Sequence, residues 1–198
     1  MESDLPVGVQ LEKSIAGQMG ALDVAWSPDG SKLAVAYRDK TIRIWSAQTW
    51  MVTKELKGHS DAVTAIAWSR DGHYLASASV DRTVRVWSQP GGRLSFTLKD
   101  FLRAPKKIAW CPAMPANLLA IGCSDGLLLL WDLAKGSTAD RVKQATFSME
   151  LTWSPDGSEL LLGGPNSIHR MNAETEPWLP KGLTRGDAPR DRRKRPMG

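Results

Sequence analysis

Three side chains of the types that serine hydrolases combine, Ser77, His59 and Asp81, fall within one short stretch of the chain. In many such hydrolases the serine nucleophile stands on a sharp turn between a strand and a helix. The sequence predicts no helix of any length, so Ser77 occupies no such turn. Because the chain also lacks a glycine-rich phosphate loop, these residues do not indicate an enzyme.

Metal chemistry has no better support, because the two cysteines, Cys111 and Cys123, lack the second Cys or His pair of a zinc site. We expect reduced, half-buried thiols, no metal and no cofactor, as in a cytosolic or nuclear protein. The acidic start resembles no signal or transit peptide, and apolar stretches such as residues 127–131 are far shorter than the roughly 18 residues of a membrane helix. These features predict an intracellular protein, cytoplasmic, nuclear or both, that does not enter a membrane.

The elements that position these side chains follow a sequence repeat. Seven of the nine tryptophans fall into two regular series. The first series is Trp26, Trp68, Trp110 and Trp153, with spacings of 42, 42 and 43 residues, and the second is Trp45, Trp87 and Trp131, with spacings of 42 and 44. A period of about 40 to 45 residues matches the four strands of one propeller blade.

A turn directly follows the first tryptophan in three of the four units. Its sequence is Ser-Pro-Asp-Gly at residues 27–30 and 154–157, and Ser-Arg-Asp-Gly at residues 69–72. Proline presets a turn dihedral and glycine accepts a positive φ, so these segments predict tight connections between two strands. The third unit has a longer loop, residues 111–117, at the same place.

The second unit carries a specific family pattern. The dipeptide Gly58-His59, the strand-like run from Val63 to Trp68 and the run from Tyr74 to Trp87 together resemble the consensus of the WD-repeat family. The resemblance implies an all-β protein, a β-propeller of about four blades over residues 7–173. The expected units are about 17–57, 58–99, 100–143 and 144–173, and a strand at 7–14 precedes them. We expect an N-terminal arm at 1–6 and a disordered basic tail at 174–198.

The resemblance also implies a buried hydrogen-bonded tetrad in the second unit. In blades of this family a His, a Ser or Thr, an Asp and a Trp bond to one another, and the matching residues are His59, Ser77, Asp81 and Trp87, with Ser79 as an alternative to Ser77. Buried polar groups need such partners to avoid a desolvation cost of several kcal/mol.

The other units keep the tetrad only in part. The first retains Asp39 and Trp45, with Val35 at the serine position, and the third retains Asp125 and Trp131, with Phe101 and Ile121 at the His and Ser positions. The fourth places Asn166 and Met171 where Asp and Trp are expected. We expect these blades to depend on apolar packing.

Ring closure is the open question, because rings of this family most often hold seven blades. We expect an incomplete or split ring, either a shortened form of a longer propeller or one completed by another chain. An open arc would expose the outer faces of the first and fourth units as apolar patches, which would favour self-association.

Partners of such propellers usually bind where the turns between second and third strands meet the loops that enter the first strand. The contact candidates at those positions are Arg38, Lys40, Ser60, Asp61, Val80, Arg82 and Ser124. Leu129 is a further candidate, because it stands where the aligned strands carry Arg43 and Arg85. It makes an apolar strand that a partner, or the chain's own tail, is expected to cover.

The charge is concentrated at the C-terminus. Of the formal net charge of +5, residues 185–198 contribute +4, from six basic and two acidic residues. The cluster Arg190, Arg192, Arg193, Lys194 and Arg195 fits a nuclear-import signal or an electrostatic arm for nucleic acid. Two hypotheses follow: a non-catalytic scaffold or adaptor for other proteins, or a nucleic-acid-associated WD-repeat protein that uses this tail.

Overall fold

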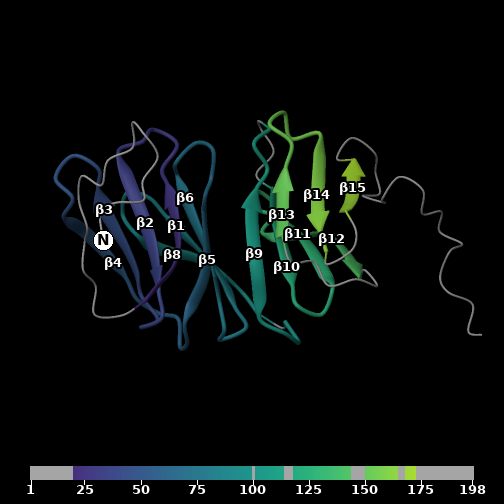
Figure 1. Ribbon diagram of the computed structural model, residues 1–198, viewed down its shortest axis with the longest axis horizontal. Helices are drawn as coiled ribbons and strands as arrows, with labels where there is room; N and C mark the ends of the chain where they lie inside the picture. The colour runs from purple at the N-terminus through teal and green to yellow at the C-terminus, as the bar shows by residue number, and fades with distance from the viewer. Residues whose placement is uncertain (1–19, 100, 114–117, 144–149, 165–167, 173–198) are drawn as a thin grey trace, which may run out of the picture.

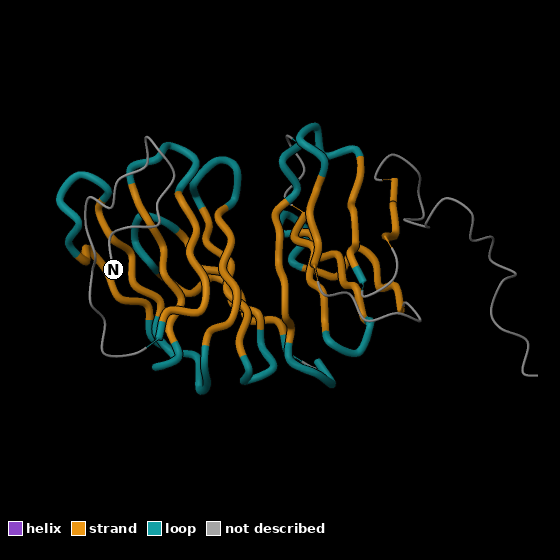
Figure 2. Tube along the Cα trace, in the orientation of Figure 1, coloured by secondary structure: helices purple, strands orange, loops and turns teal. Residues whose placement is uncertain are grey.

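The structure of the protein is a computed structural model that describes residues 20–99, 101–113, 118–143, 150–164 and 168–172. Those residues form β-strands joined by turns and loops, as Figure 2 shows by colour. No helix that could cross a membrane is found in this part of the chain.

Within the described ranges, fifteen strands form four antiparallel sheets, here called blades 1 to 4, each built from strands consecutive in sequence (Figure 1). Blade 1 contains β1 (Ala21–Trp26), β2 (Lys32–Tyr37), β3 (Ile42–Ser46) and β4 (Val52–Leu56); blade 2 contains β5 (Val63–Trp68), β6 (Tyr74–Ser79), β7 (Val84–Ser88) and β8 (Arg93–Leu98). Blade 3 contains β9 (Pro105–Trp110), β10 (Leu118–Cys123), β11 (Leu127–Asp132) and β12 (Ser137–Lys143); blade 4 contains β13 (Glu150–Trp153), β14 (Glu159–Gly163) and β15 (Ile168–Asn172). The chain is therefore an all-β, partial propeller.

The hairpin turns after the first tryptophans adopt one conformation. In the first of them Ser27 Oγ donates to Asp29 Oδ1 at 2.6 Å, and Gly30 has φ 69°. The turns at residues 69–72 and 154–157 repeat the serine-to-aspartate hydrogen bond and the positive φ of glycine. A side chain that caps its own turn explains why this short motif joins two strands so reliably.

The blades stack in chain order through their first strands, with β5 packed on β1, β9 on β5 and β13 on β9. We call the side of a blade that faces the preceding blade its leading face, and the side that faces the following blade its trailing face. The strand registers align three leading-face residues in each of blades 2, 3 and 4: Trp68, Leu75 and Trp87; Trp110, Leu119 and Trp131; Trp153, Leu160 and Met171.

Small residues line the trailing faces that receive these large ones. The aligned triplets are Ala25, Ala34 and Ile44 in blade 1, Ala67, Ala76 and Val86 in blade 2, and Ala109, Ala120 and Leu130 in blade 3. Each pair of facing sets belongs to one buried apolar cluster. The core therefore consists of three layers of large residues packed against small ones, one between each pair of neighbouring blades.

A hydrogen bond repeats in each of these layers. The indole Nε1 of Trp68 donates to the carbonyl oxygen of Ala25 at 3.1 Å, that of Trp110 to Ala67 at 3.1 Å, and that of Trp153 to Ala109 at 3.2 Å. Trp68, Trp110 and Trp153 thus join blades 2, 3 and 4 to the backbone of the blade before each of them.

The two ends of the stack differ. On the leading face of blade 1, Val24 is 58% and Trp26 is 52% exposed, as expected for an unpaired apolar face. On the trailing face of blade 4, the triplet is Thr152, Leu161 and Arg170, where the other blades have two alanines and an aliphatic residue. Leu161 and Ile168, the latter 80% exposed, lie on the same face, but Thr152 and Arg170 interrupt the small apolar row. Among the described residues, the apolar patch expected at this second end is therefore present only in part.

Candidate interaction surface

The four residues aligned with the family tetrad meet at one edge of blade 2. Trp87 Nε1 donates to Ser77 Oγ at 2.9 Å, and Ser77 Oγ lies 2.8 Å from His59 Nε2. His59 Nδ1 lies 2.8 Å from Asp81 Oδ2. A neutral His59 that carries its proton on Nδ1 satisfies every step, with Ser77 donating to Nε2 and Nδ1 donating to the carboxylate.

Burial and hydrogen bonding set the protonation states of this tetrad. Burial lowers the pKa of His59 below its usual 6.5, against the opposing hydrogen bond and charge of Asp81, so the ring is neutral at pH 7. For Asp81, burial acts to raise the pKa, but hydrogen bonds from Thr83, Ser60 and His59 outweigh it and lower the pKa to about 2. A neutral imidazole therefore faces a carboxylate that stays ionised.

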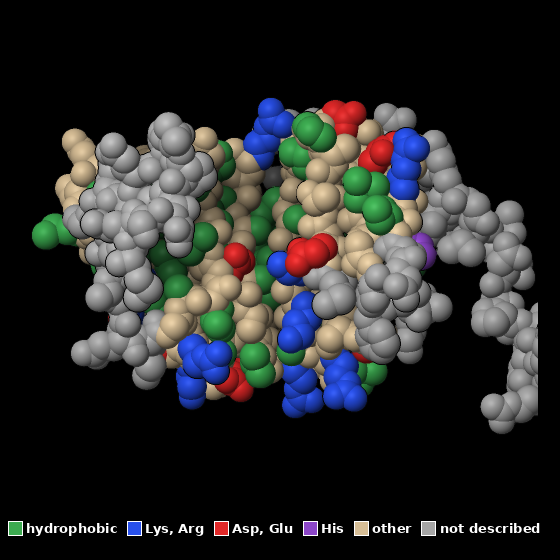
Figure 3. Space-filling model, viewed as in Figure 1, with side chains coloured by type: hydrophobic (Ala, Val, Ile, Leu, Met, Phe, Trp, Pro, Cys, Tyr) green, Lys and Arg blue, Asp and Glu red, His purple; other side chains and the backbone are tan. Residues whose placement is uncertain are grey.

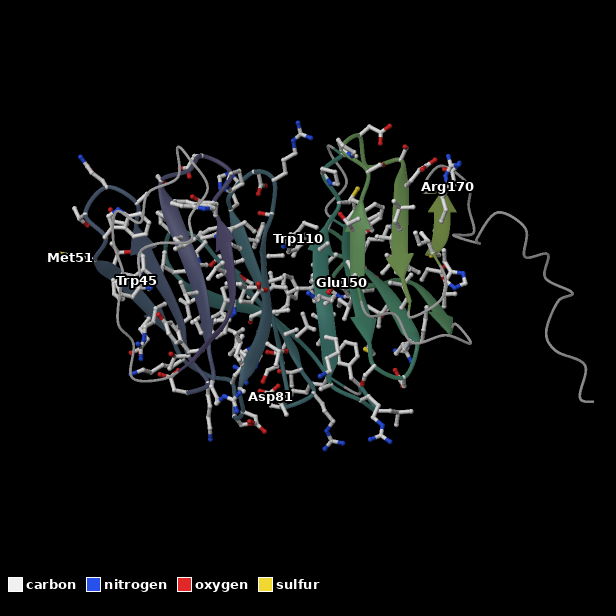
Figure 4. All side chains as sticks on the ribbon, in the orientation of Figure 1. Trp45, Met51, Asp81, Trp110, Glu150 and Arg170 are labelled. Atoms are coloured by element: carbon white, nitrogen blue, oxygen red, sulfur yellow. The ribbon has the colours of Figure 1, made fainter. Side chains whose placement is uncertain are left out.

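Asp81 connects two segments that are distant in sequence. Ser60 N donates to its Oδ2 at 3.0 Å, and Thr83 donates to its Oδ1 from both backbone nitrogen and hydroxyl. The neighbouring Ser79 is not part of the tetrad, since its hydroxyl bonds to the carbonyl oxygen of Asp61. The β6–β7 turn and the loop that enters β5 are thereby held as one rigid edge, which lies at the bottom in Figure 4.

The tetrad is structural in its chemistry. Ser77 is fully buried, and the His59 and Asp81 side chains are 1% and 4% exposed. A substrate carbonyl has no access to the Ser77 hydroxyl, so this arrangement cannot work as a hydrolase triad.

Blade 1 stabilises its equivalent turn differently. Asp39 accepts hydrogen bonds from Thr41 and forms an ion pair with Arg43, whose Nη2 lies 2.8 Å from Asp39 Oδ2. The Arg43 guanidinium in turn stacks over the Tyr37 ring. Val35 replaces the serine, and Trp45 Nε1 is buried with no hydrogen-bond partner in the part of the chain that the structure describes. The turn keeps its shape while one indole donor stays unsatisfied.

Blade 3 replaces the polar tetrad by apolar contacts. Phe101 and Ile121 are 5% and 0% exposed, and Trp131 packs edge-to-face on Phe96 with ring centroids 4.9 Å apart. Asp125 accepts only a long hydrogen bond, 3.3 Å, from Leu127 N among the interactions of the described residues. Apolar packing therefore positions the turn that carries Ser124.

Most of the predicted contact residues lie together on one surface, which is formed by the β2–β3 and β6–β7 turns and the loops that enter β5 and β9. We call this surface the turn edge. Arg38, Lys40, Ser60, Asp61, Val80 and Arg82 are exposed, and Ser124 is half-buried. Lys40 and Arg82 occupy the same turn position with left-handed φ values of 74° and 62°. Lys and Arg side chains gather along the corresponding lower edge in Figure 3.

Leu129 does not belong to this surface, so its assignment as a contact residue is wrong. It is 3% exposed and lies in the cluster between blades 2 and 3. The neighbouring blade 2, not a partner or the tail, covers Leu129, because its position on β11 faces the preceding blade.

Sequence reasoning missed two residues of the same edge, Leu102 and Arg103. Both are exposed, Leu102 at 81%, in the loop that enters β9. The signal was available, since this loop corresponds to the one that carries Ser60 and Asp61 in blade 2.

The cysteines offer no further site among the described residues. Cys111 and Cys123 are free and buried, and burial raises the pKa of Cys123 to about 12. No group of three or more potential metal ligands occurs among the described residues. Asn166 and the basic cluster from Arg190 to Arg195 lie outside the described residues.

The chain is similar to known proteins in both sequence and structure. A family model described as "WD domain, G-beta repeat" matches residues 10–46 and 50–88. THO complex subunit 3 of Arabidopsis thaliana is 30% identical over 144 residues, which make up 71% of this chain and 32% of that protein.

A solved structure described as "Structure of U3-55K" has a TM-score of 0.72 at 18% identity, over 84% of this chain and 53% of that one. At this identity the likeness supports the fold alone. The chain spans about a third of the length of the curated relative and about half of the solved structure.

Proposed function

We propose, from the premise that this chain belongs to the WD-repeat family of β-propellers, that it is a non-catalytic scaffold that binds other proteins at its turn edge. The observation that carries this proposal is the double anchoring of the β6–β7 turn by Asp81, which presents Arg82 and Val80 on a fixed backbone. Preorganised side chains bind partners with less loss of conformational entropy.

The charges of the turn edge indicate the chemistry of its partner. Arg38, Lys40, Arg82 and Arg103 are exposed and outnumber the one exposed carboxylate among the contact candidates, that of Asp61. The carboxylates of Asp39 and Asp81 accept hydrogen bonds from within the protein. Val80, at 43%, and Leu102, at 81%, add exposed apolar side chains between these charges. An acidic protein segment that carries an apolar residue complements this surface.

The similarity to THO complex subunit 3 supports the assignment of the chain to a multiprotein complex, because that relative is itself named as a complex subunit. The free, buried cysteines fit an intracellular location, cytoplasmic or nuclear, which is part of this proposal.

Charge reversal at the turn edge tests the function. The variant Lys40→Glu with Arg82→Glu is compared with a control, Arg93→Glu with Lys135→Glu, which reverses two exposed charges outside the turn edge. Proteins captured from a cell lysate are quantified by mass spectrometry for the wild-type chain and both variants.

We expect the control to retain the wild-type set of captured proteins and the turn-edge variant to lose it. An identical set for all three proteins would exclude the turn edge as the binding surface. Capture that nuclease treatment abolishes would favour the nucleic-acid hypothesis over the scaffold.

A further inference from the structure

We infer that a groove between blades 1 and 2, on the edge opposite the turn edge, is a second docking site, and that it binds an extended, acidic segment of a partner protein. The groove lies at the ends of the strands that the β1–β2, β3–β4 and β7–β8 turns connect. Both of its walls lie within residues 27–92, which the structure describes throughout. It shares no residue with the turn edge, so the inference does not depend on the proposed function.

The groove has two adjoining parts. The first part is a pocket of about 670 Å³ between β3 and β4 of blade 1 and the β7–β8 turn of blade 2, with Lys54 and Gln89 on its two walls. The second part is a hollow of about 450 Å³ between the β1–β2 and β5–β6 turns, with Pro28 and Trp68 among its lining residues. Lys32 lines both parts. Two adjoining hollows fit an extended segment, which can place one residue in each of them.

Lysines on blade 1 stand where aromatic residues fill the next junction. By strand register, Lys32 and Lys54 correspond to Tyr74 and Phe96 of blade 2. Tyr74 packs on the apolar cluster between blades 2 and 3, and the Phe96 ring contacts that of Trp131 with centroids 4.9 Å apart. A lysine keeps its ammonium group in contact with water, so the two lysines leave the corresponding space between blades 1 and 2 open.

Gln89 shows the same contrast on the opposite wall. It directly follows β7, as Leu133 directly follows β11. Leu133 is 7% exposed and belongs to the apolar cluster between blades 2 and 3, whereas Gln89 Nε2 is buried without a hydrogen-bond partner among the described residues. Because the last torsion of glutamine is broad, a small rotation would turn this amide toward the pocket, where an oxygen atom of a ligand would satisfy it.

The charges of the first part favour an acidic ligand. Lys32 and Lys54 line it, and no carboxylate does so among the described residues. Lys54 Nζ donates to the carbonyl oxygen of Gly91 at 2.5 Å, which holds the β7–β8 turn against blade 1. The Lys32 ammonium group makes no hydrogen bond or ion pair with a described residue, because the nearby Asp29 accepts its hydrogen bonds within its own turn. A ligand carboxylate would therefore pair with Lys32 and accept from the glutamine amide.

The second part of the groove selects a different kind of residue. Its charges balance, since the carboxylates of Asp29 and Asp71 stand beside Lys32 and Arg70. Both carboxylates accept hydrogen bonds from the serine of their own turn, and the Trp68 ring adds an apolar wall. The site therefore fits an acidic residue in its first part and a neighbouring apolar residue in its second part.

A peptide selection tests the site. The filled variant, Lys54→Phe with Gln89→Leu, gives this junction the residue types that fill the one between blades 2 and 3. A library of random short peptides displayed on phage is first depleted on the filled variant and then selected on the wild-type chain. We expect the selected peptides to share a glutamate or aspartate beside an apolar residue.

Fluorescence anisotropy of a labelled synthetic copy of the selected peptide locates its site. Lys32→Gln should weaken binding about tenfold, because one charged hydrogen bond is lost, and the filled variant should abolish binding. Lys135→Gln is the matched control, since it removes a lysine from the β11–β12 turn on the same edge, and it should bind as the wild-type chain does. The turn-edge variant, Lys40→Glu with Arg82→Glu, should also bind normally. Circular dichroism and thermal melting verify that each variant is folded.

Three results would overturn the inference. The first is a selection without a shared sequence, including the case in which the chain's own residues already fill the groove. The second is equal affinity of the selected peptide for the wild-type chain and for the folded Lys32→Gln chain or the folded filled variant. The third is loss of binding by the turn-edge variant, which would move the peptide to the turn edge. A turn edge that binds no protein would contradict the proposed function and would change none of these readings.

Discussion

Asp81 has the largest share of polar contacts at the turn edge. Its carboxylate accepts hydrogen bonds from His59, Ser60 and Thr83, and its side chain is only 4% exposed. The identity of the tetrad was predictable from the sequence, because the Gly58-His59 dipeptide and the later Asp and Trp match a known spacing. The unpaired Trp45 indole was not predictable, because Val35 alone does not reveal whether another acceptor takes the place of serine.

Replacing Asp81 by alanine should lower the free energy of unfolding by about 3 kcal/mol, because the buried His59 ring and the backbone amides of Ser60 and Thr83 lose their acceptor. Urea denaturation of the wild-type chain and Asp81→Ala measures the difference. Asp61→Ala is the control, since this exposed carboxylate bonds only to the adjacent Ala62 N among the described residues. Equal stabilities of the three proteins would refute the structural role of the tetrad.

His59 and Asp81 make the free energy of unfolding depend on pH in two steps. His59 has a lower pKa folded than unfolded, so its contribution is complete above the unfolded value of 6.5 and is lost as the pH falls below it. Asp81 likewise contributes fully above its unfolded pKa of 3.8, and this contribution is lost as the pH falls toward its folded pKa of about 2.

Both steps run in the same direction, so the unfolding free energy should decrease from pH 7.5 to pH 5 and again below pH 4. Urea denaturation at these pH values provides the test. A stability that is constant between pH 7.5 and pH 5 would contradict the neutral, buried state of His59.

At the scale of the strands, the first tryptophan series explains why the blades stack. The 42-residue spacing predicted the strands and their turns, which the described residues confirm. The spacing could not predict the bond from Trp110 to the Ala67 carbonyl, because a backbone acceptor leaves no trace in the sequence. Leu129 shows the same limit: its apolar character was evident, but which neighbour covers it depends on the packing of blade 3 on blade 2.

Trp110→Phe should destabilise the chain by about 1 to 2 kcal/mol, because the Ala67 carbonyl loses its donor and the smaller ring leaves space between blades 2 and 3. Trp26→Phe is the matched control, since Trp26 is half exposed and makes no such bond within the described residues. Its unfolding midpoint in urea should stay close to the wild-type value. Equal losses for the two variants would mean that the repeated hydrogen bond adds nothing to stacking.

At the scale of the whole molecule, the stack of blades has a direction. Blade 1 presents unpaired large apolar residues, and blade 4 ends in a row that contains Thr152 and Arg170, at opposite ends of the chain's order of blades. Trp45 and Arg170 mark these two ends in Figure 4. The repeat pattern alone predicts equivalent ends, because the contrast becomes visible only when the strand registers align Thr152 with the alanines of the other blades.

Sedimentation velocity of the wild-type chain over a wide concentration range tests this asymmetry most directly. An isolated chain whose two ends do not match should sediment as a single species of 21.7 kDa at every concentration, and Val24→Asp should leave that mass unchanged. Growth of the sedimenting species with concentration, reversed by Val24→Asp, would show that two copies join through blade 1 and would contradict the account.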